Sequence, residues 1–374
     1  MRKRILYVMH VDWDWIKQRP HFIAQHLSLS HDLLVAFPWA KNRAILSKNS
    51  RGDFPILPFL RMPVTGLPLF SHAVNRTLLR LYFRITIRWF CPDFVWLTSP
   101  ELFDYFPKNT PVRFIYDCMD DALGFEDKPS KITLLRRLEI ALLDKSFHTI
   151  VSSNDLAKKI HARARCQQKC TVIHNAFEEN AAAEQTSSRP NPVVKKTGVI
   201  TIGYIGTISA WFDFDALLAC ANRFKNVEVH LIGPVDRVNI PSWRHGQIHF
   251  HGPVPHGALA FLAQSFDILI MPFKVCDLVR SVDPIKLYEY ILFDKPIIAV
   301  RYAEIERFDE FVSFYSTHHE LISTLEALID SGCKQKYSTS ARQIFLEKNS
   351  WASRASQIQN ALGWTRDSEF VDIR

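Results

Sequence analysis

Short, continuous apolar runs alternate with longer segments of helical period along most of the chain. Such runs are typical of strands that are buried on both faces of a parallel sheet. The repeated alternation of strand and helix predicts an α/β fold with parallel sheets. The runs lie at 4–9, 33–37, 94–97, 114–116, 149–153 and 171–176 in the first half, and at 199–206, 227–233, 248–250, 268–273 and 297–300 in the second.

Apolar residues at helical spacing predict helices between these strands. One further segment, 54–70, is rich in proline and large apolar residues and fits no element clearly. The predicted helices span 19–29, 72–90, 130–147, 154–160 and 340–362, and another begins at Pro284.

A polar, proline-bearing segment divides this pattern near the middle of the chain. Residues 181–197 have the composition of a linker, and a new strand begins directly after them. The length of 374 residues also favours two domains. We therefore predict domains at 1–180 and 198–345, followed by a C-terminal helical segment at 346–374.

The totals favour a cytoplasmic protein with an anionic partner. The formal net charge is +8, which suits a nucleotide, a nucleic acid or an anionic membrane. The seven cysteines are scattered, without the second close pair that would complete a zinc site, so reduced thiols are expected. The basic N-terminus leads into a short apolar run, which predicts a first strand and no signal peptide. The sequence contains no run of about 18 apolar residues, so no transmembrane helix is expected.

The segment 281–300 (SVDPIKLYEYILFDKPIIAV) is the strongest candidate for ligand binding. Asp283 is an N-cap candidate, and Pro284 suits the first helical position. Lys286 and Glu289 are three residues apart and share one helix face. A helix N-terminus binds anions such as phosphate, because its N–H groups lack partners and the macrodipole is positive there. Glu289 could accept hydrogen bonds from sugar hydroxyls; the alternative is an ordinary capped helix with a surface ion pair.

Three carboxylates follow the predicted strand at 114–116. Asp117, Asp120 and Asp121 lie where a doubly wound fold places reacting groups, just beyond the carboxyl end of a strand. An aspartate there could act as the general base for an acceptor hydroxyl. The alternative is an acidic turn that caps the helix starting near Ser130. We predict all three as catalytic candidates, with Asp117 first because it follows the strand directly.

The loop after the first strand combines carboxylates with tryptophans. Asp12, Trp13, Asp14 and Trp15 lie in this loop, and Arg19 opens the next helix. The loop lacks the G-x-G-x-x-G pattern, so a dinucleotide is not expected here. Tryptophan rings commonly pack on sugar faces, which favours an acceptor sugar at this loop. The alternative is that both tryptophans belong to the core.

Four arginines recur at every fourth position in the predicted helix at 72–90. Arg76, Arg80, Arg84 and Arg88 drift by only about 40° per step, so they form one basic stripe. Such a stripe could lie on an anionic membrane surface. The alternative is a solvated edge of a packed helix. A nucleic-acid partner is not expected, because no recognition motif accompanies the stripe.

The segment 281–300 resembles the nucleotide-binding helix of the GT-B glycosyltransferases. The shared pattern is a proline-led helix, a glutamate at Glu289, and a Lys295-Pro296 turn into a strand. In retaining members of that fold, such a glutamate ends an E-x7-E motif. Ser281 stands where the first glutamate of the motif would be, so the stereochemical course stays open.

Other parts of the chain resemble the same proteins. A glycine loop at Gly206, a Gly252-Pro253 loop and a Pro272-Phe273 loop precede the helix in the order that these proteins show. Residues 171–176 resemble the phrase that ends their N-terminal domain, with two substitutions. The resemblance covers nearly the whole chain and is best over 199–300.

The resemblance implies two Rossmann-like, doubly wound domains that face a central cleft, with the C-terminal helix crossing back to the N-terminal domain. It implies a glycosyltransferase of the bacterial surface polysaccharide type. Such an enzyme moves a sugar from a UDP- or GDP-linked donor to a hydroxyl of a glycan or lipid-linked glycan. No cofactor or metal is expected, because basic side chains would neutralise the charge of the leaving group. A lipid-linked acceptor would bring the protein to the inner face of the cell membrane; the oligomeric state is not predicted.

The resemblance also implies which residues form each part of the site. The predicted donor site comprises Gly206, Thr207, Gly252, Pro253, Val254, Lys274, Arg280, Ser281, Val282, Asp283, Pro284, Ile285, Lys286 and Glu289. The predicted acceptor site comprises Asp12, Trp13, Asp14, Trp15 and Arg19.

Two other functions stay open at this stage. A nucleotide-sugar epimerase shares the fold, but it needs no acceptor and no lipid-facing surface, so the arginine stripe and the segment 54–70 favour the transferase. A non-catalytic nucleotide-sugar-binding subunit is favoured by the substitution at Ser281. The carboxylates after the strand at 114–116 are evidence against that second alternative.

Overall fold

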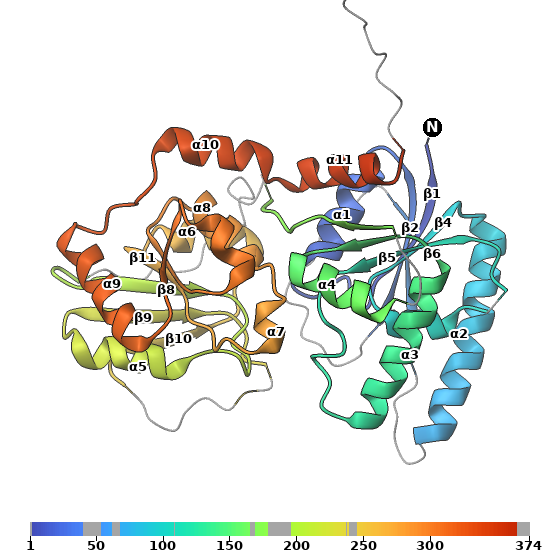
Figure 1. The fold of residues 1–374 in the computed structure, drawn as a ribbon, viewed down its shortest axis with the longest axis horizontal. Coiled ribbons are helices and arrows are strands. Elements are labelled where there is room, and N and C mark those ends of the chain that lie inside the picture. Colours follow the sequence, from blue (N-terminus) through green and yellow to red (C-terminus); the bar gives the residue numbers. More distant parts are fainter. Residues whose placement is uncertain are drawn as a thin grey trace, which may run out of the picture. The chain divides into compact units, whose positions relative to one another are not determined.

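The structure is a computed structural model of the chain (Figure 1). It describes residues 2–39, 54–61, 68–107, 109–164, 169–178, 196–236, 238 and 245–364, with the backbone alone for 68–72. The predicted linker at 181–197 lies outside the described residues except for its last two, and so does the middle of the segment 54–70.

The chain divides into two compact units. The N-terminal unit consists of Met1–His174 together with Trp351–Arg374, and the C-terminal unit consists of Asn175–Ser350. Each unit is built on one parallel sheet whose strands are joined by helices (Figure 1).

The N-terminal unit has a seven-stranded sheet in the order β3-β2-β1-β4-β5-β6-β7. Its strands are β1 (Arg4–Val8), β2 (Asp32–Trp39), β3 (Ile56–Leu60), β4 (Phe94–Leu97), β5 (Arg113–Cys118), β6 (Ser146–Val151) and β7 (Cys170–Val172). Its helices are α1 (Arg19–Ser28), α2 (Pro68–Phe90), η1 (Pro100–Tyr105), α3 (Pro129–Lys145), α4 (Asn154–Arg163) and α11 (Trp351–Ala361).

The C-terminal unit has a six-stranded sheet in the order β10-β9-β8-β11-β12-β13. Its strands are β8 (Ile200–Ile205), β9 (Val227–Ile232), β10 (Ile248–Gly252), β11 (Ile268–Met271), β12 (Ile297–Val300) and β13 (Val312–Tyr315). Its helices are α5 (Phe214–Arg223), η3 (His256–Ala258), α6 (Leu259–Ala263), α7 (Asp277–Arg280), α8 (Ile285–Leu292), η4 (Ala303–Phe308), α9 (His318–Asp330) and α10 (Thr339–Lys348).

Both sheets are doubly wound, which confirms the predicted α/β fold. In each sheet the strand order reverses beside the first strand, between β1 and β4 in one unit and between β8 and β11 in the other. Ligands of such sheets bind at this reversal, outside the carboxyl ends of the strands. The apolar runs form strands because they are buried on both faces: Ile5 to Val8 of β1 and Ile268 to Met271 of β11 are all fully buried.

Two elements differ from the sequence-based prediction. The segment 54–70 contains β3, which pairs in parallel with β2 at the edge of the sheet. Pro58 hides this strand in the sequence, although an edge strand tolerates proline because one side of its backbone needs no partner. The predicted single helix at 340–362 is two helices, α10 and α11, which are interrupted at Asn349 and Ser350. The Asn349 side chain donates a hydrogen bond back to the carbonyl of Phe345.

The C-terminal segment packs against the first helix and the sheet of the N-terminal unit. The ring of Trp351 stacks on Phe22 of α1, with centroids 5.1 Å apart. Trp364 packs against Phe94 of β4, with centroids 4.9 Å apart. Both tryptophans are buried, so α11 and the described residues after it, up to Trp364, contribute to this unit's core.

Candidate functional site

The reversal point of the C-terminal sheet is shaped by two glycines. Gly206 follows β8 with φ +149°, and Gly233 follows β9 with φ +143°. A Cβ on Gly233 would lie 2.1 Å from the carbonyl oxygen of Gly206, so the two loops meet backbone to backbone. A Cβ on Gly206 would lie 1.9 Å from Cε of Lys286. The Lys286 side chain therefore lies directly against the glycine loop, and a Cβ at position 206 would have to displace it.

Lys286 is the cation at this reversal point. Its ammonium lies 5.8 Å from the ring centroid of Tyr204 and 5.8 Å from that of Phe273. Burial lowers the pKa of Lys286, and the nearby Glu289 carboxylate opposes this shift. Two aromatic faces thus hold a partly desolvated ammonium beside the start of α8, where an anion would be attracted most strongly.

Glu289 lies one turn further along α8 and is 9% exposed. Its Oε1 accepts a hydrogen bond from Nε2 of His256 at 3.0 Å. His256 opens η3, shortly after the Gly252-Pro253 loop. The sequence analysis did not identify His256, although its place after a glycine loop at the end of a strand was an available signal.

Asp283 does not cap α8, which corrects the predicted N-cap. The helix begins at Ile285, Pro284 holds the N-cap position, and no side-chain hydrogen bond caps the helix. The buried Asp283 carboxylate instead accepts hydrogen bonds from the backbone N–H of Asn175 at 2.5 Å, from the Tyr288 hydroxyl and from Arg307. Its contribution to a ligand site is therefore the placement of α8.

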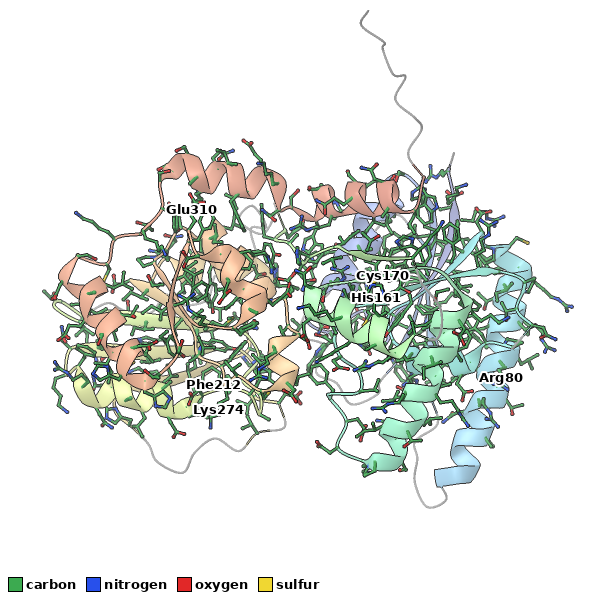
Figure 2. The ribbon with its side chains drawn as sticks, in the orientation of Figure 1. Arg80, His161, Cys170, Phe212, Lys274 and Glu310 are labelled. Atoms are coloured by element: carbon green, nitrogen blue, oxygen red, sulfur yellow. The ribbon has the colours of Figure 1, made fainter. Side chains whose placement is uncertain are left out.

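The other predicted donor residues fall into two groups. Lys274 and Arg280 are largely exposed and form surface ion pairs, at 3.7 Å with Asp215 and at 3.5 Å with Asp277 (Lys274 is labelled in Figure 2). Ser281 is buried, and its hydroxyl lies 3.4 Å from the carbonyl of Asp277. The remaining predicted donor residues lie at the ends of strands, in the loops after them, or at the start of α8: Thr207, Gly252, Pro253, Val254, Val282 and Ile285. The carbonyl of Thr207 accepts a hydrogen bond from the Tyr204 hydroxyl.

In the N-terminal unit, Asp117 and Arg19 form a buried ion pair. Asp117 was predicted as a general base and Arg19 as an acceptor contact, and both roles require access to substrate. Nε of Arg19 lies 3.0 Å from Oδ1 of Asp117, and both side chains are 1% exposed. Arg19 also donates to the carbonyl of Ile173 at 2.8 Å. Burial raises the pKa of Asp117, while Arg19 lowers it. The pair joins α1 to β5, and its inaccessibility is physical evidence against a base at Asp117 and an acceptor contact at Arg19.

Asp121 is held by cations. It is 5% exposed, and it forms ion pairs with Arg163 at 2.9 Å and with Lys159 at 3.1 Å. Burial alone would raise the pKa of Asp121, but the two cations outweigh burial and lower it. This carboxylate stays ionised and engaged with α4, so it is a poor proton acceptor.

Asp120 is the carboxylate with the properties of a base. It is half-buried just beyond the carboxyl end of β5, and no described residue forms an ion pair or a hydrogen bond with its carboxylate. Burial raises the pKa of Asp120 to about 7; Arg19 opposes the shift, whereas Asp121 and Asp117 reinforce it. A base is most effective when its pKa lies near the working pH.

His10 is a second group at this edge that the sequence analysis did not identify. Its Nδ1 lies 2.8 Å from Oγ1 of Thr98, which joins the ends of β1 and β4 across the strand reversal. Burial lowers the pKa of His10 to about 4, so the ring is neutral at neutral pH. Its position directly after the first strand was the available signal, because ligands bind at that end of the sheet.

The loop after β1 is largely buried, whereas residues that bind an acceptor sugar must be exposed. Trp13 is 1% exposed, and its ring lies between His21 at 5.1 Å and Phe54 at 5.6 Å. Its predicted stacking on a sugar is therefore not supported, because the ring is already enclosed. The Asp12 side chain accepts a hydrogen bond from the backbone N–H of Asp14 at 3.0 Å. This contact forms a turn within the loop. Trp15 is half-buried, and its packing on an acceptor sugar stays a prediction.

The predicted arginine stripe lies on α2, with one correction. Arg80, labelled in Figure 2, is half-buried and pairs with Asp104 at 3.1 Å, so it belongs to the packed edge of the helix. The other three arginines are exposed. The same helix exposes four large apolar side chains, each between 54% and 66% exposed: Leu78, Leu81, Ile85 and Trp89. No helix among the described residues is long and apolar enough to cross a membrane.

Comparison with known proteins shows what this arrangement is similar to. The family model described as "Glycosyl transferase-like" matches residues 215–360, which include the glycine loop at Gly233 and all of α8. These residues are therefore similar to a glycosyltransferase domain. A Bacillus subtilis (strain 168) protein named "Putative teichuronic acid biosynthesis glycosyltransferase TuaH" is 22% identical over 197 residues, 50% of each chain. The match thus spans about half the length of this curated relative.

Solved structures with the same fold are glycosyltransferases of the GT-B class. Anabaena HepE in complex with UDP and glucose superposes with a TM-score of 0.70 at 14% identity, covering 97% of this chain and 100% of that chain. Sucrose-phosphate synthase from Thermosynechococcus elongatus gives 0.65 at 11% identity, covering 96% and 98%. At these identities the likeness shows the fold. Together with the match over residues 215–360, it confirms the predicted resemblance to glycosyltransferases and the GT-B fold class.

Replacing Asp117 by asparagine is expected to destabilise the N-terminal unit by about 3–5 kcal/mol, because it leaves the buried Arg19 charge without compensation. Urea-induced unfolding followed by tryptophan fluorescence measures this loss. The matched control is Asp155→Asn, which removes a carboxylate from a partly exposed ion pair with Lys159. The control should cost less than about 1 kcal/mol. Equal stability of the two variants, with transfer lost only in Asp117→Asn, would show that Asp117 acts on substrate.

Proposed function

We propose that this chain transfers a sugar from a uridine diphosphate sugar to a hydroxyl group of a glycan or lipid-linked glycan. The observation that carries the proposal is the position of the Lys286 ammonium beside the start of α8, within the matched residues 215–360. The Lys286 side chain also packs against Gly206, which precedes the matched residues. UDP is the first nucleotide to consider, because structures of the same fold were obtained with UDP, UDP and glucose, or UDP-glucose.

The diphosphate of the donor would lie at the start of α8. The first N–H groups of a helix lack intrahelical partners, and the positive end of the helix dipole is there. Gly206 lets the β8 loop approach the phosphates closely, and Lys286 adds a full positive charge. The Glu289 carboxylate, oriented by His256, would accept hydrogen bonds from ribose hydroxyls.

The acceptor hydroxyl would bind at the carboxyl edge of the N-terminal sheet, next to Asp120. Asp120 takes the proton of the hydroxyl, and the acceptor oxygen forms a bond to the anomeric carbon of the sugar. The bond between that carbon and the β-phosphate oxygen breaks, and its electron pair leaves with UDP. Lys286 and the α8 N-terminus stabilise the charge that develops on the departing diphosphate. A direct displacement of this kind inverts the anomeric configuration.

Loss of the Lys286 charge should weaken nucleotide binding without harming the fold. We expect Lys286→Met and Glu289→Gln each to raise the Kd for UDP by about 10- to 100-fold, because a hydrogen bond to a charged group contributes roughly 1.5–3 kcal/mol. Isothermal titration calorimetry with UDP and with GDP measures this. Unchanged affinity for both nucleotides in both variants would rule out α8 as the donor site.

A pair of glycine variants tests the close approach at the same loop. Gly206→Ala should lose UDP affinity, because the new Cβ would displace Lys286. Gly198→Ala is the matched control: Gly198 also has a positive φ of +78°, but no atom lies within 4 Å of the added Cβ. Both variants carry backbone strain, so strain alone should affect them alike. A loss of nucleotide binding in Gly206→Ala alone would therefore come from the contact with Lys286.

Asp120→Asn should keep UDP binding and lose transfer by about 100-fold or more, the scale of general base catalysis. The wild-type rate kcat/KM should fall as the pH drops below about 7, because protonated Asp120 cannot accept the hydroxyl proton. A pH profile of transfer to a glycan acceptor measures both effects. A wild-type profile that is flat from pH 5 to 8, or an active Asp120→Asn enzyme, would contradict the assignment.

The anomeric proton of the product, followed by NMR, separates the proposal from the two alternatives. An inverted linkage that forms only with acceptor present agrees with direct transfer. Conversion of the UDP-sugar in the absence of acceptor would instead indicate the epimerase. UDP-sugar binding without any turnover, across an acceptor panel, would indicate the non-catalytic subunit.

We further propose that α2 brings the enzyme to an anionic membrane. Leu78, Leu81, Ile85 and Trp89 lie within an arc of about 80° at 100° per residue, and they are exposed. Arg84 and Arg88 border this arc. An apolar stripe edged with arginines and ending in tryptophan is the composition of helices that lie in a membrane interface. A lipid-linked acceptor would be reached from this position.

Liposome flotation tests the α2 proposal. The double variant Arg84→Gln/Arg88→Gln should bind vesicles containing phosphatidylglycerol about 10- to 30-fold more weakly, because each arginine near such a surface contributes about 1 kcal/mol. The control Arg136→Gln/Arg137→Gln removes the same charge from exposed positions of α3 and should bind like the wild type. Equal flotation of all three proteins, or none with any, would mean that α2 is only a solvated face.

A further inference from the structure

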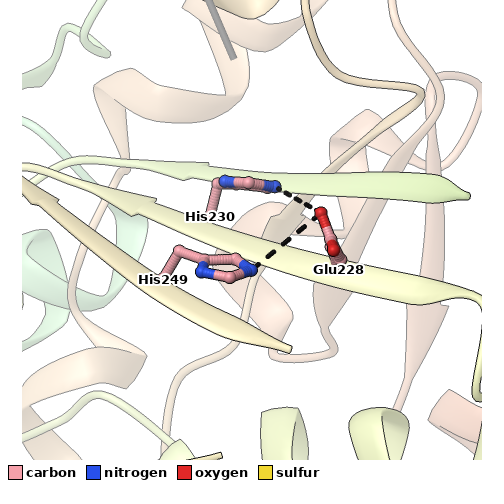
Figure 3. A group of neighbouring side chains, drawn as sticks. All are labelled: Glu228, His230 and His249. Carbon is pink, nitrogen blue, oxygen red and sulfur yellow. Dashed lines mark ion pairs between the residues drawn. The ribbon is translucent and has the colours of Figure 1, made fainter. Parts of the chain in front are cut away.

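Three titratable side chains form a cluster on one face of the C-terminal sheet that the proposed reaction does not use. Glu228 and His230 are two residues apart on β9, so they point to the same face. His249 on β10 is the register partner of His230. Their rings stack with centroids 4.8 Å apart, and both face the Glu228 carboxylate (Figure 3). We propose that Glu228, His230 and His249 together bind a Zn²⁺ ion.

The ligand atoms point at a common position without bonding to one another. Oε2 of Glu228 lies 3.8 Å from Nε2 of His230 and 3.9 Å from Nε2 of His249. These separations are too long for hydrogen bonds. Both Nε2 atoms are buried and have no hydrogen-bond partner among the described residues. Buried nitrogens without a hydrogen-bond partner are uncommon. The lone pair of each Nε2 atom could instead bind a metal ion.

The spacing suits a tetrahedral ion after a small adjustment. All three ligand atoms lie within 4.8 Å of one another. Zn²⁺ with nitrogen and oxygen ligands at about 2.0–2.1 Å would hold neighbouring ligand atoms about 3.4 Å apart. His249 can swing inward because its side chain is 36% exposed. Two imidazoles and one carboxylate leave a fourth position for water, a donor set that favours Zn²⁺ over Mg²⁺ or Ca²⁺.

The surroundings orient the ligands. Nδ1 of His230 lies 2.9 Å from Nε2 of His251, so His251 can accept the Nδ1 proton and leave Nε2 of His230 for the ion. Metal-bound histidines usually have such a partner on the other ring nitrogen. His251 reaches this position because the β10 register shifts between Phe250 and Gly252. The ring of Phe266 packs against His230 at 5.8 Å and forms an apolar wall on the inner side.

One nearby cation opposes the ion. Nζ of Lys196 lies 2.7 Å from Oε1 of Glu228, on the carboxylate oxygen that does not face the histidines. Lys196 is exposed, so it can turn into solvent when a metal takes its place beside the carboxylate. Metal binding must displace the Lys196 ammonium from Glu228. The variant Lys196→Met lacks this competing charge, so it should bind Zn²⁺ more tightly than the wild type.

The ion would be structural. Glu228 is the second residue of β9 and His249 the second of β10, whereas the donor loops follow the opposite, carboxyl ends of the strands. The ion would clamp the edge strand β10 to its neighbour β9. It would therefore add stability to the C-terminal unit without entering the transfer reaction, which leaves the expectation of a metal-independent reaction unaffected.

Calorimetric titration of the tag-free full chain with ZnCl₂ tests the proposal. We expect one equivalent to bind and the melting temperature to rise, because an ion that binds only the folded state stabilises it. Co²⁺ substitution should give the visible absorption of a four-coordinate site. Glu228→Gln and His249→Ala should each weaken Zn²⁺ binding at least tenfold, and His251→Ala by about 10- to 100-fold. UDP affinity should not change in these variants.

The matched control is His319→Ala, which removes an exposed histidine from α9 in the same unit. It should bind Zn²⁺ like the wild type. Three results would overturn the proposal: no saturable binding by the wild type, wild-type binding by both Glu228→Gln and His249→Ala, or loss of binding in the control. Glu228→Gln preserves the shape of the side chain, and circular dichroism of each variant confirms that a loss of binding is not a loss of fold.

Discussion

The position of α8 depends on one buried carboxylate. Asp283 accepts hydrogen bonds from the first backbone N–H of the C-terminal unit, at Asn175, and from Arg307 of η4. A desolvated charge of this kind is costly unless it is fully paired, so these partners determine where the helix begins. Arg307 also compensates a negative charge that would otherwise repel phosphate. Because Asp283 is paired with Arg307, the positive charge of Lys286 stays available to a nucleotide. An anion is therefore attracted to this edge of the sheet.

Most of the fold could be predicted because buried parallel strands have a local signature. Runs such as 297–300 are apolar throughout, and nearly every predicted strand has its counterpart in the structure. The misses have local causes as well. Pro58 disguises β3, whose edge position tolerates it. The break between α10 and α11 depends on a side-chain hydrogen bond of Asn349, which no periodicity reveals.

The site was less predictable, because its chemistry depends on contacts between distant residues. Arg19 and Asp117 are 98 positions apart, and only their meeting shows that the most attractive carboxylate is a structural one. The raised pKa of Asp120 likewise arises from burial and neighbours that the sequence does not place together. The cluster around His230 could be predicted in part. The sequence shows Glu228 and His230 two residues apart in one strand and His249 in the next, but only the register of the two strands brings them together.

If α2 rests on a membrane as proposed, its exposed apolar side changes how the enzyme would meet its substrates. A sugar nucleotide arrives from solution in three dimensions. A lipid-linked acceptor moves only within the plane of the bilayer. An enzyme resting on that plane through Ile85 and Trp89 would share a thin layer with its acceptor, where linked partners experience effective concentrations on the order of millimolar. A weak affinity for the acceptor would then suffice, and the density of the lipid in the leaflet, more than its total amount in the cell, would set the rate of transfer.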